Sequence, residues 1–305
     1  MKAARLNEWG KAIVIEDVDQ PEPGDDEVLV RIHAASVNPF DNALHAGYLQ
    51  GMASVPMTMG TDFAGEVATV GKNITDLKPG DEVFGSSPLG RGTFAEYVLV
   101  KPHELARKPR SVDYVSSAAV PLSSMAAWIS LFDELQVQPG EKLLIIGAAG
   151  NVGSIATQLA KEKGVYVYGV DIPEKAEHIL ALGLDKFIPH TEHFEDHVQD
   201  VNAVLDLVGG EMTGRAYNVL KPGGRYVTSL EAEPPQEEPN RRGIHSMGLG
   251  AFPRAEVLAN MAEHIDTGRM RVAINRTFPL EEVNEAMMYR MQTRAPGKVV
   301  ISLLQ

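Results

Sequence analysis

The chain has 305 residues, 44% hydrophobic and 23% charged, a composition typical of one large or two ordinary globular domains. Its formal net charge of −13 repels phosphate backbones and anionic lipid surfaces, so we expect neither nucleic acid nor a membrane as partner. Cysteine is absent, which excludes disulfides, thiolate nucleophiles and cysteine-bound metals.

The N-terminal third of the chain reads as short strands separated by proline and glycine turns. Strands are predicted at 28–32, 63–70, 82–84 and 93–100. Gly65 falls inside one of these strands, where a glycine marks a bulge or a close contact. The turn residues Lys78-Pro79-Gly80-Asp81 precede another. This part of the chain therefore predicts a small β barrel or sandwich.

From residue 116 onward, helix and strand patterns alternate. Helices are predicted at 117–135, 152–163, 173–182 and 213–220, and strands at 142–146, 165–170, 203–207 and 225–229. The run KLLII (142–146) is apolar throughout, as in a strand buried on both faces of a parallel sheet. Alternating β and α elements at this spacing predict a doubly wound parallel sheet.

The last part of the chain begins with a polar segment that contains three prolines, 231–242, for which we expect an exposed loop. Helices at 256–266 and 281–291 follow, and then a strand at 299–303. The first ten residues are too polar for a signal peptide, and no apolar run approaches ~18 residues, so we expect a cytoplasmic protein.

The strongest local motif lies between the predicted strand 142–146 and the helix that follows it. Its residues are Gly147, Ala148, Ala149, Gly150, Asn151, Val152 and Gly153. Small residues let a backbone approach a pyrophosphate, and the helix N-terminus offers free N–H groups to that anion. Gly153 would let the helix pack close to the sheet. The motif predicts a dinucleotide site; the alternative is a tight turn that binds nothing.

Asp171 ends the second strand of this unit, 21 residues after Gly150. A carboxylate at that place accepts hydrogen bonds from the adenosine ribose and repels a 2′-phosphate, which favours NADH over NADPH. Lys175 could instead pair with such a phosphate. In the alternative interpretation Asp171 caps a helix and Lys175 is a solvated surface charge.

Several segments, taken in order, are similar to one known family. They are VNPFDNALHAG (37–47), MGTDFAGEVATVG (59–71), LKPGDEVFG (77–85), GTFAEYVLV (92–100), AAVPLSSMAAW (118–128), GAAGNVGSIATQLAK (147–161), VLDLVGG (204–210), LKPGGRYV (220–227) and GKVVISL (297–303). Together they resemble the medium-chain dehydrogenase/reductase superfamily and, within it, the zinc-free quinone oxidoreductase (zeta-crystallin-like) branch. The resemblance covers nearly the whole chain.

This resemblance implies an α/β fold, with a GroES-like, β-rich catalytic domain and a Rossmann cofactor domain. We place the catalytic domain at 1–117 and 262–305 and the cofactor domain at 118–261. Zinc-dependent members hold their metal with residues that match Asn38, Thr61 and Asp62. An amide, a hydroxyl and one carboxylate make a poor zinc site, so we expect no metal.

The resemblance also implies site residues. Asn38 and Tyr48 match side chains that face the nicotinamide and the substrate in the quinone reductase branch, and we assign them as catalytic. We further assign cofactor contacts to His190, Val208, Gly209 and Ser229. On the residues alone, Asn38 caps a loop and Tyr48 is half-buried.

The sequence thus predicts a reductase that passes hydride from NADPH or NADH to a small quinone. Asp171 favours NADH, whereas the branch usually prefers NADPH. The alternatives are an enone or enal double-bond reductase and a low-turnover redox sensor. The redox sensor remains an alternative because Ala126 replaces a threonine that the branch usually carries. The resemblance implies a homodimer. His193 and His197 lie among acidic residues, which favours a solvated face over a metal site.

Overall fold

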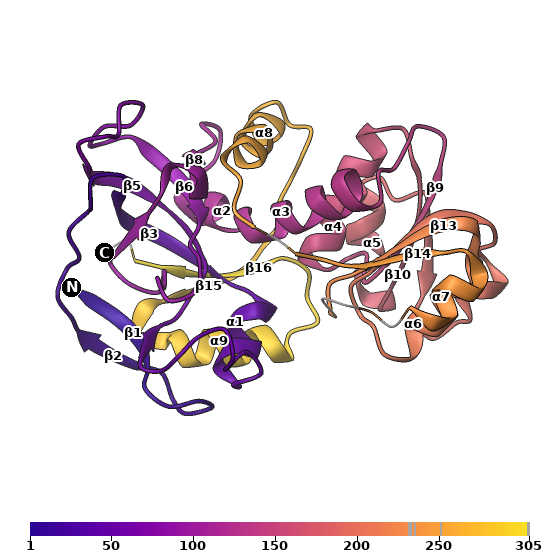
Figure 1. Cartoon of the computed structure of the whole chain (residues 1–305), viewed down its shortest axis with the longest axis horizontal. Coiled ribbons are helices and arrows are strands. Elements are labelled where there is room, and N and C mark those ends of the chain that lie inside the picture. The colour runs from indigo at the N-terminus through magenta and orange to yellow at the C-terminus, as the bar shows by residue number, and fades with distance from the viewer. Residues whose placement is uncertain (231–233, 235, 251, 304–305) are drawn as a thin grey trace.

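The computed structural model describes residues 1–230, 234, 236–250 and 252–303. The chain forms two lobes side by side (Figure 1). Both termini lie in the lobe at the left of that view, and a parallel sheet forms the centre of the other lobe. Within the described ranges, no helix is long and apolar enough to cross a membrane.

The first lobe is built mainly from antiparallel strands. They are β1 (Lys2–Leu6), β2 (Val14–Asp17), β3 (Val28–Val37), β4 (Met57–Thr58), β5 (Asp62–Val70), β6 (Glu82–Ser86), β7 (Tyr97–Val100), β8 (Leu105–Arg107), β15 (Ile274–Pro279) and β16 (Lys298–Ser302). In the larger sheet the order is β15-β16-β3-β5-β6-β8, with β7 also paired to β3. Because β16 pairs with β3, the last described strand lies in the same sheet as the N-terminal strands.

The second lobe contains six parallel strands in the order β11-β10-β9-β12-β13-β14. Their bounds are β9 (Lys142–Ile146), β10 (Tyr166–Asp171), β11 (Lys186–Pro189), β12 (Val201–Asp206), β13 (Leu220–Thr228) and β14 (His245–Gly248). This order is that of a dinucleotide-binding Rossmann sheet, which confirms the predicted α/β fold class. The sequence patterns did not indicate β11 and β14.

Helices cover both lobes. They are α1 (Pro39–His45), α2 (Tyr114–Ala118), α3 (Pro121–Trp128), α4 (Asn151–Glu162), α5 (Ala176–Ala181), α6 (Glu211–Val219), α7 (Glu237–Arg242), α8 (Ala255–Asp266) and α9 (Val283–Gln292). Helix α8 packs against both β8 and α3, and so contacts elements of both lobes. Since the predicted domain boundary at 261/262 falls inside α8, the domain bounds stay a prediction.

Several predicted elements were wrong in extent, three of them in more than their end residues. The single helix at 117–135 is divided into α2, α3 and a π-helical turn (Ile129–Glu134), because Pro121 cannot donate a hydrogen bond and begins a new helix. The strand at 93–100 is regular only as β7. The loop at 231–242 contains α7, whose Pro239 occupies a first-turn position that needs no N–H; residues 231–233 and 235 lie outside the described residues.

Candidate functional site

The predicted phosphate-binding turn connects β9 to α4. Gly147 has φ +84°, and a Cβ at Gly153 would lie 2.4 Å from the Gly147 carbonyl oxygen, so only glycine fits at the start of this helix. The first intrahelical bond runs from Ser154 N to Gly150 O (2.8 Å). The amides of Asn151, Val152 and Gly153 therefore face the open end of the helix, where an anion is favoured.

A second loop, after β12, meets this turn. A Cβ at Gly147 would be 3.2 Å from Val208 Cγ2, so the two loops are in contact. Strands β9 and β12 are neighbours at the point where the strand order reverses, and nucleotides bind in that crevice of doubly wound sheets. The structure thus brings two predicted cofactor segments together at the expected edge of the sheet.

The buried carboxylate of Asp206 fixes the shape of the second loop. Its Oδ1 accepts hydrogen bonds from the backbone N–H groups of Val208 (2.9 Å) and Gly209 (2.8 Å). Its Oδ2 accepts one from the Tyr226 hydroxyl (2.8 Å), and its backbone carbonyl accepts one from Ser229 N (3.3 Å). Burial raises the pKa of Tyr226 above its usual range, which keeps this hydroxyl a donor. Sequence reasoning had not identified Asp206.

Asp171, Lys175 and His190 gather at the carboxyl ends of β10 and β11. Asp171 Oδ2 accepts a hydrogen bond from Ala149 N (2.8 Å), so this carboxylate also holds the phosphate-binding turn. Lys175 Nζ lies 3.7 Å from Asp171 Oδ1, and His190 N donates to Asp171 O (2.9 Å). An acidic and a basic side chain therefore stand together where the adenosine ribose of a dinucleotide is expected.

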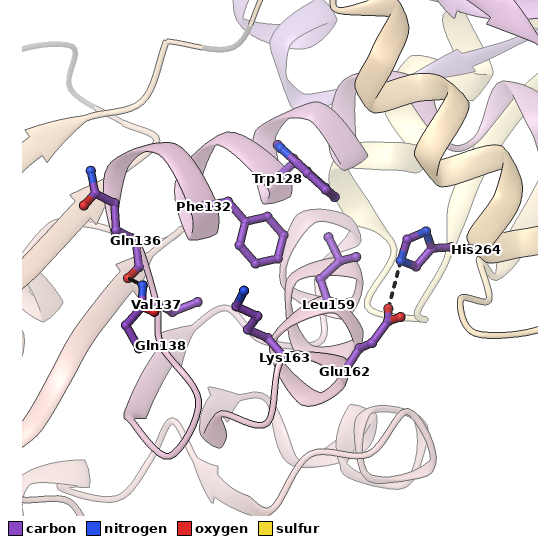
Figure 2. Close-up of a pocket in the computed structure, with 9 residues that line it drawn as sticks. All are labelled: Trp128, Phe132, Gln136, Val137, Gln138, Leu159, Glu162, Lys163 and His264. Atoms are coloured by element: carbon purple, nitrogen blue, oxygen red, sulfur yellow. Dashed lines mark hydrogen bonds and ion pairs between the residues drawn. The ribbon is translucent and has the colours of Figure 1, made fainter.

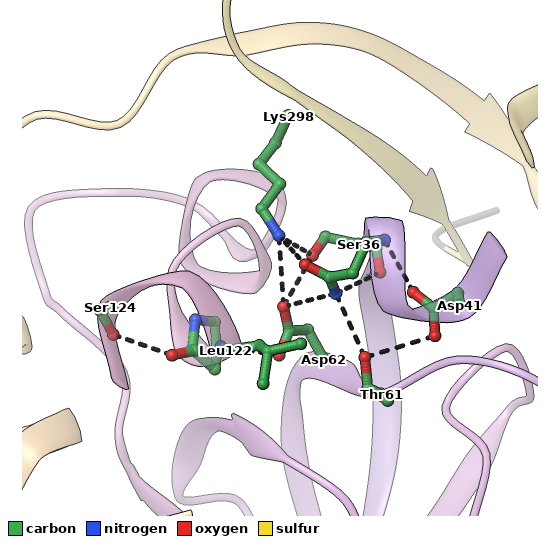
Figure 3. A network of polar contacts seen from close by, with 9 residues as sticks. Ser36, Asp41, Thr61, Asp62, Leu122, Ser124 and Lys298 are labelled. Atoms are coloured by element: carbon green, nitrogen blue, oxygen red, sulfur yellow. Dashed lines mark hydrogen bonds and ion pairs between the residues drawn. The ribbon is translucent and has the colours of Figure 1, made fainter. Parts of the chain in front are cut away.

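Asn38 belongs to a buried network of polar side chains. Figure 3 labels its partners Asp41, Thr61, Asp62 and Lys298. Its Nδ2 donates to Thr61 Oγ1 (3.2 Å) and to Asp62 Oδ2 (3.0 Å), and its backbone N donates to Asp41 Oδ2 (2.7 Å). Lys298 Nζ donates to Asn38 Oδ1. The two amide hydrogens thus already have acceptors, and Asn38 would have to give up one of these bonds to donate to a substrate.

Lys298 and Asp41 are the ionisable members of the network that sequence reasoning missed. Burial raises the pKa of Asp41 to about 7, whereas burial lowers the pKa of Lys298 and the nearby carboxylates of Asp62 and Asp41 oppose that change. The network joins residues more than 230 positions apart, such as Asp62 and Lys298. No local pattern could have indicated this contact.

Tyr48 lies apart from this network. It follows α1, whereas Asn38 precedes it, and α1 is about 10 Å long at 1.5 Å per residue. The Tyr48 side chain is 83% exposed, so it is free to contact a ligand but is not held by the protein. The structure therefore does not bring the two predicted catalytic side chains into mutual contact.

The residues that match zinc ligands do not suit a divalent cation. Asn38 and Asp62 both accept hydrogen bonds from the Lys298 ammonium, which places a positive charge where a metal would need these oxygens. In the described part of the chain, no group of three or more His, Asp or Glu side chains could hold a metal ion. His197 instead pairs with Glu192 (2.8 Å).

A hollow of about 690 Å³ lies on another side of the second lobe, between α3, α4 and α8 (Figure 2). Trp128 and Phe132 form its aromatic wall, and a contact between His264 Nε2 and Glu162 Oε2 (2.8 Å) closes one side. It contains none of the predicted site residues. We therefore assign the site to the β9–β12 crevice rather than to this hollow.

Comparison with known families agrees with this architecture. The profile described as "Alcohol dehydrogenase GroES-like domain" matches residues 24–110. The profile described as "Zinc-binding dehydrogenase" matches residues 182–301. The first match falls on the first lobe, and the second covers the part of the second lobe from β11 onward together with β15 and β16.

Individual relatives cover almost the whole chain. The NADPH-dependent alkenal/one oxidoreductase of Arabidopsis thaliana is 32% identical over 99% of this chain and 79% of its own length. The human quinone oxidoreductase is 28% identical over 99% of this chain and 98% of its own. The solved structure of the quinone oxidoreductase from Coxiella burnetii superimposes with a TM-score of 0.93, at 28% identity, covering 100% of this chain and 99% of the other.

Proposed function

We propose, from the premise that this chain belongs to the medium-chain dehydrogenase/reductase superfamily of oxidoreductases, that it reduces quinones with NADH or NADPH and without zinc. The nucleotide dependence and the oxidoreductase class are those of the family. The single observation that supports nucleotide binding best is the close packing at Gly153. It leaves the first amides of α4 open beside the β12 loop.

The bound nucleotide would supply the hydride, and the residues of the chain would bind and orient the reactants. The open amides at the start of α4, residues 151–153, would hold the diphosphate, and the 208–209 loop would lie beside it. The exposed ring of Tyr48 would stack on a flat, electron-poor acceptor, and Asn38 would donate to that acceptor by giving up its hydrogen bond to Thr61 or Asp62. We expect Asn38→Ala and Tyr48→Ala to lower kcat/KM for 1,4-benzoquinone; unchanged turnover in both variants would refute this assignment.

For the choice of cofactor we propose NADH over NADPH. The Asp171 carboxylate is fixed by Ala149 N and by Ile172 N (2.8 Å each), so it cannot turn away from a 2′-phosphate. Lys175, 3.7 Å away, offsets only part of that charge. Dissociation constants for both nucleotides, measured by fluorescence titration, test the proposal: equal values or tighter NADPH binding would contradict it.

Zinc independence has its own test. Because the Lys298 ammonium already occupies the acceptor oxygens of Asn38 and Asp62, we expect turnover to survive prolonged dialysis against a chelator. Elemental analysis of the active protein should then find no stoichiometric zinc. Loss of activity on chelation, with recovery on adding zinc, would contradict the proposal.

A double-bond reductase is the second candidate, supported by the 32% identity to the Arabidopsis alkenal/one oxidoreductase. Steady-state oxidation of NADH and NADPH with 1,4-benzoquinone and with an alkenal separates the candidates. We expect faster turnover with the quinone. Turnover only with the alkenal would favour the second candidate, and nucleotide binding without turnover on either acceptor would favour a redox sensor.

We also propose a homodimer joined through the edge of the cofactor sheet. Among the described residues, β14 pairs with β13 on one side only, which leaves a strand edge for a second copy. Light scattering after size-exclusion chromatography tests it. A mass equal to one 33.1 kDa chain at micromolar concentration would contradict the proposal.

A further inference from the structure

Lys298 is a completely buried lysine at the start of β16, with a side-chain exposure of 0%. Its ammonium donates to Ser36 Oγ (3.2 Å), to Asn38 Oδ1 and to Asp62 Oδ2 (3.4 Å). Burying a charge carries a large desolvation penalty, and an apolar side chain of similar volume often serves stability as well or better. Stability alone therefore does not explain why this charge is buried. We look for the explanation in the side chains that the ammonium binds.

The ammonium determines which way the Asn38 amide points. An ammonium can only donate and an ionised carboxylate can only accept. With Lys298 on one side and Asp62 on the other, the amide oxygen must face Lys298 and the amide nitrogen must face Asp62 and Thr61. A hydrogen bond accepted by the amide oxygen also polarises the amide and strengthens its N–H groups as donors.

The same network reaches the helix that packs on the cofactor lobe. Asp62 Oδ1 accepts a hydrogen bond from Leu122 N (2.9 Å) in the first turn of α3, and α3 packs on α4. Figure 3 shows Lys298 descending from β16 toward Ser36 and Asp62, with Leu122 on the far side of Asp62. The Lys298–Asp62 pair thus connects the Asn38 side chain to the layer that carries the phosphate-binding turn.

We propose that Lys298 is a positioning residue for hydride transfer, a fixed internal cation that holds Asn38 and Asp62 in one arrangement between the lobes. It takes over at these residues the ordering role that a metal ion has at the matching positions of zinc-dependent members. This inference rests on the proposed quinone reductase function. It identifies a group, distant in sequence from the predicted site, on which that function depends.

The test is a double-mutant cycle on turnover with NADH and 1,4-benzoquinone. Lys298→Met should lower kcat about 10- to 100-fold, the cost of misplacing one catalytic side chain, while the nucleotide dissociation constant changes less than about twofold. Because Lys298 acts through Asn38, Asn38→Ala added to Lys298→Met should lower kcat by less than about twofold more.

Lys108 provides the matched control. It is also a buried lysine, held by Pro109 O (2.9 Å), Val112 O (2.8 Å) and Glu82 (3.7 Å), but it lies outside the network. Lys108→Met should lower the free energy of unfolding and leave kcat unchanged. If Lys298→Met fails to fold, Lys298→Met with Asp62→Asn also removes the buried charge of Asp62 and serves for the same cycle. Urea unfolding of the wild type, Lys298→Met, Asn38→Ala and their double variant gives a readout independent of turnover. The losses in the free energy of unfolding should also be non-additive in this cycle.

Additive losses in kcat would overturn the inference, and so would a Lys298→Met enzyme as active as Lys108→Met. In both cases the proposed function would stand, provided that the wild-type protein reduces quinones. Non-additive losses in the free energy of unfolding, together with additive losses in kcat, would also overturn it, because Lys298 would then stabilise the fold alone. A wild-type protein without quinone turnover would refute the proposed function itself, and this inference with it.

Discussion

Replacing Gly153 by alanine perturbs the nucleotide site at a single carbon atom. The added Cβ would lie 2.4 Å from Gly147 O and 2.6 Å from Ala148 O, whereas ordinary contacts begin at 3.4 Å. The turn and the start of α4 must therefore separate by about 1.0 Å, the difference between these distances. Both obstacles are backbone atoms of the turn, so no side chain can move aside to absorb the change.

This displacement moves the turn's amides away from the diphosphate. A hydrogen bond to a charged group contributes about 1.5–3 kcal/mol, and each 1.4 kcal/mol is a factor of ten in affinity. Loss of one such bond should weaken NADH binding about 10- to 100-fold. The strain also lowers the free energy of unfolding by about 1–3 kcal/mol, as expected for overpacking.

Titration of the NADH fluorescence measures this change in affinity. Gly214→Ala is the matched control, because Gly214 lies in α6 and a Cβ there meets no atom within 4 Å. That variant should bind NADH as the wild-type protein does and should gain up to about 1 kcal/mol in stability from helix propensity. A Gly153→Ala protein that binds both NADH and NADPH as tightly as the wild type would refute the assignment of the phosphate-binding turn.

Three further predictions concern the carboxylates of Asp171, Asp41 and Asp206. Asp171→Asn keeps an acceptor for Ala149 N but removes a charge, so NADPH affinity relative to NADH should rise about tenfold; an unchanged ratio of dissociation constants would contradict this. Burial raises the pKa of Asp41 from 3.8 to about 7, so the folded protein keeps a proton that the unfolded chain loses between these pH values. Stability should therefore fall by up to about 4 kcal/mol as pH rises from 4 to 7, and urea titrations of Asp41→Asn should lack that fall. Tyr226→Phe removes a donor to buried Asp206 and should lower the free energy of unfolding by about 1–2 kcal/mol, with an unchanged value contradicting the role given to that hydroxyl.

The parts of the fold that could be predicted are those whose signals lie close together in the sequence. The β9–turn–α4 unit combines a short apolar strand, small residues in the turn and a helical pattern, all within about twenty positions. The site residues Gly147, Gly153 and Asp171 were predicted for the same reason. By contrast, β14 is only four residues long and follows a proline-containing segment, so no pattern distinguishes it from a loop.

The network around Asn38 could not be predicted, because its contacts link distant parts of the chain. Lys298 precedes the apolar run of β16 and reads as an ordinary charge at the edge of a strand. Only the pairing of β16 with β3 brings it over Ser36 and Asn38. Asp41 was likewise hidden, since an acidic residue in the first turn of α1 is typical of helix capping.

Isothermal calorimetry of the wild-type protein with NADH and with NADPH tests the central claim most directly, namely that the open amides at the start of α4, residues 151–153, hold the diphosphate of a pyridine nucleotide. We predict saturable binding of one nucleotide per chain, tighter for NADH. No measurable binding of either nucleotide at millimolar concentration would contradict the whole account.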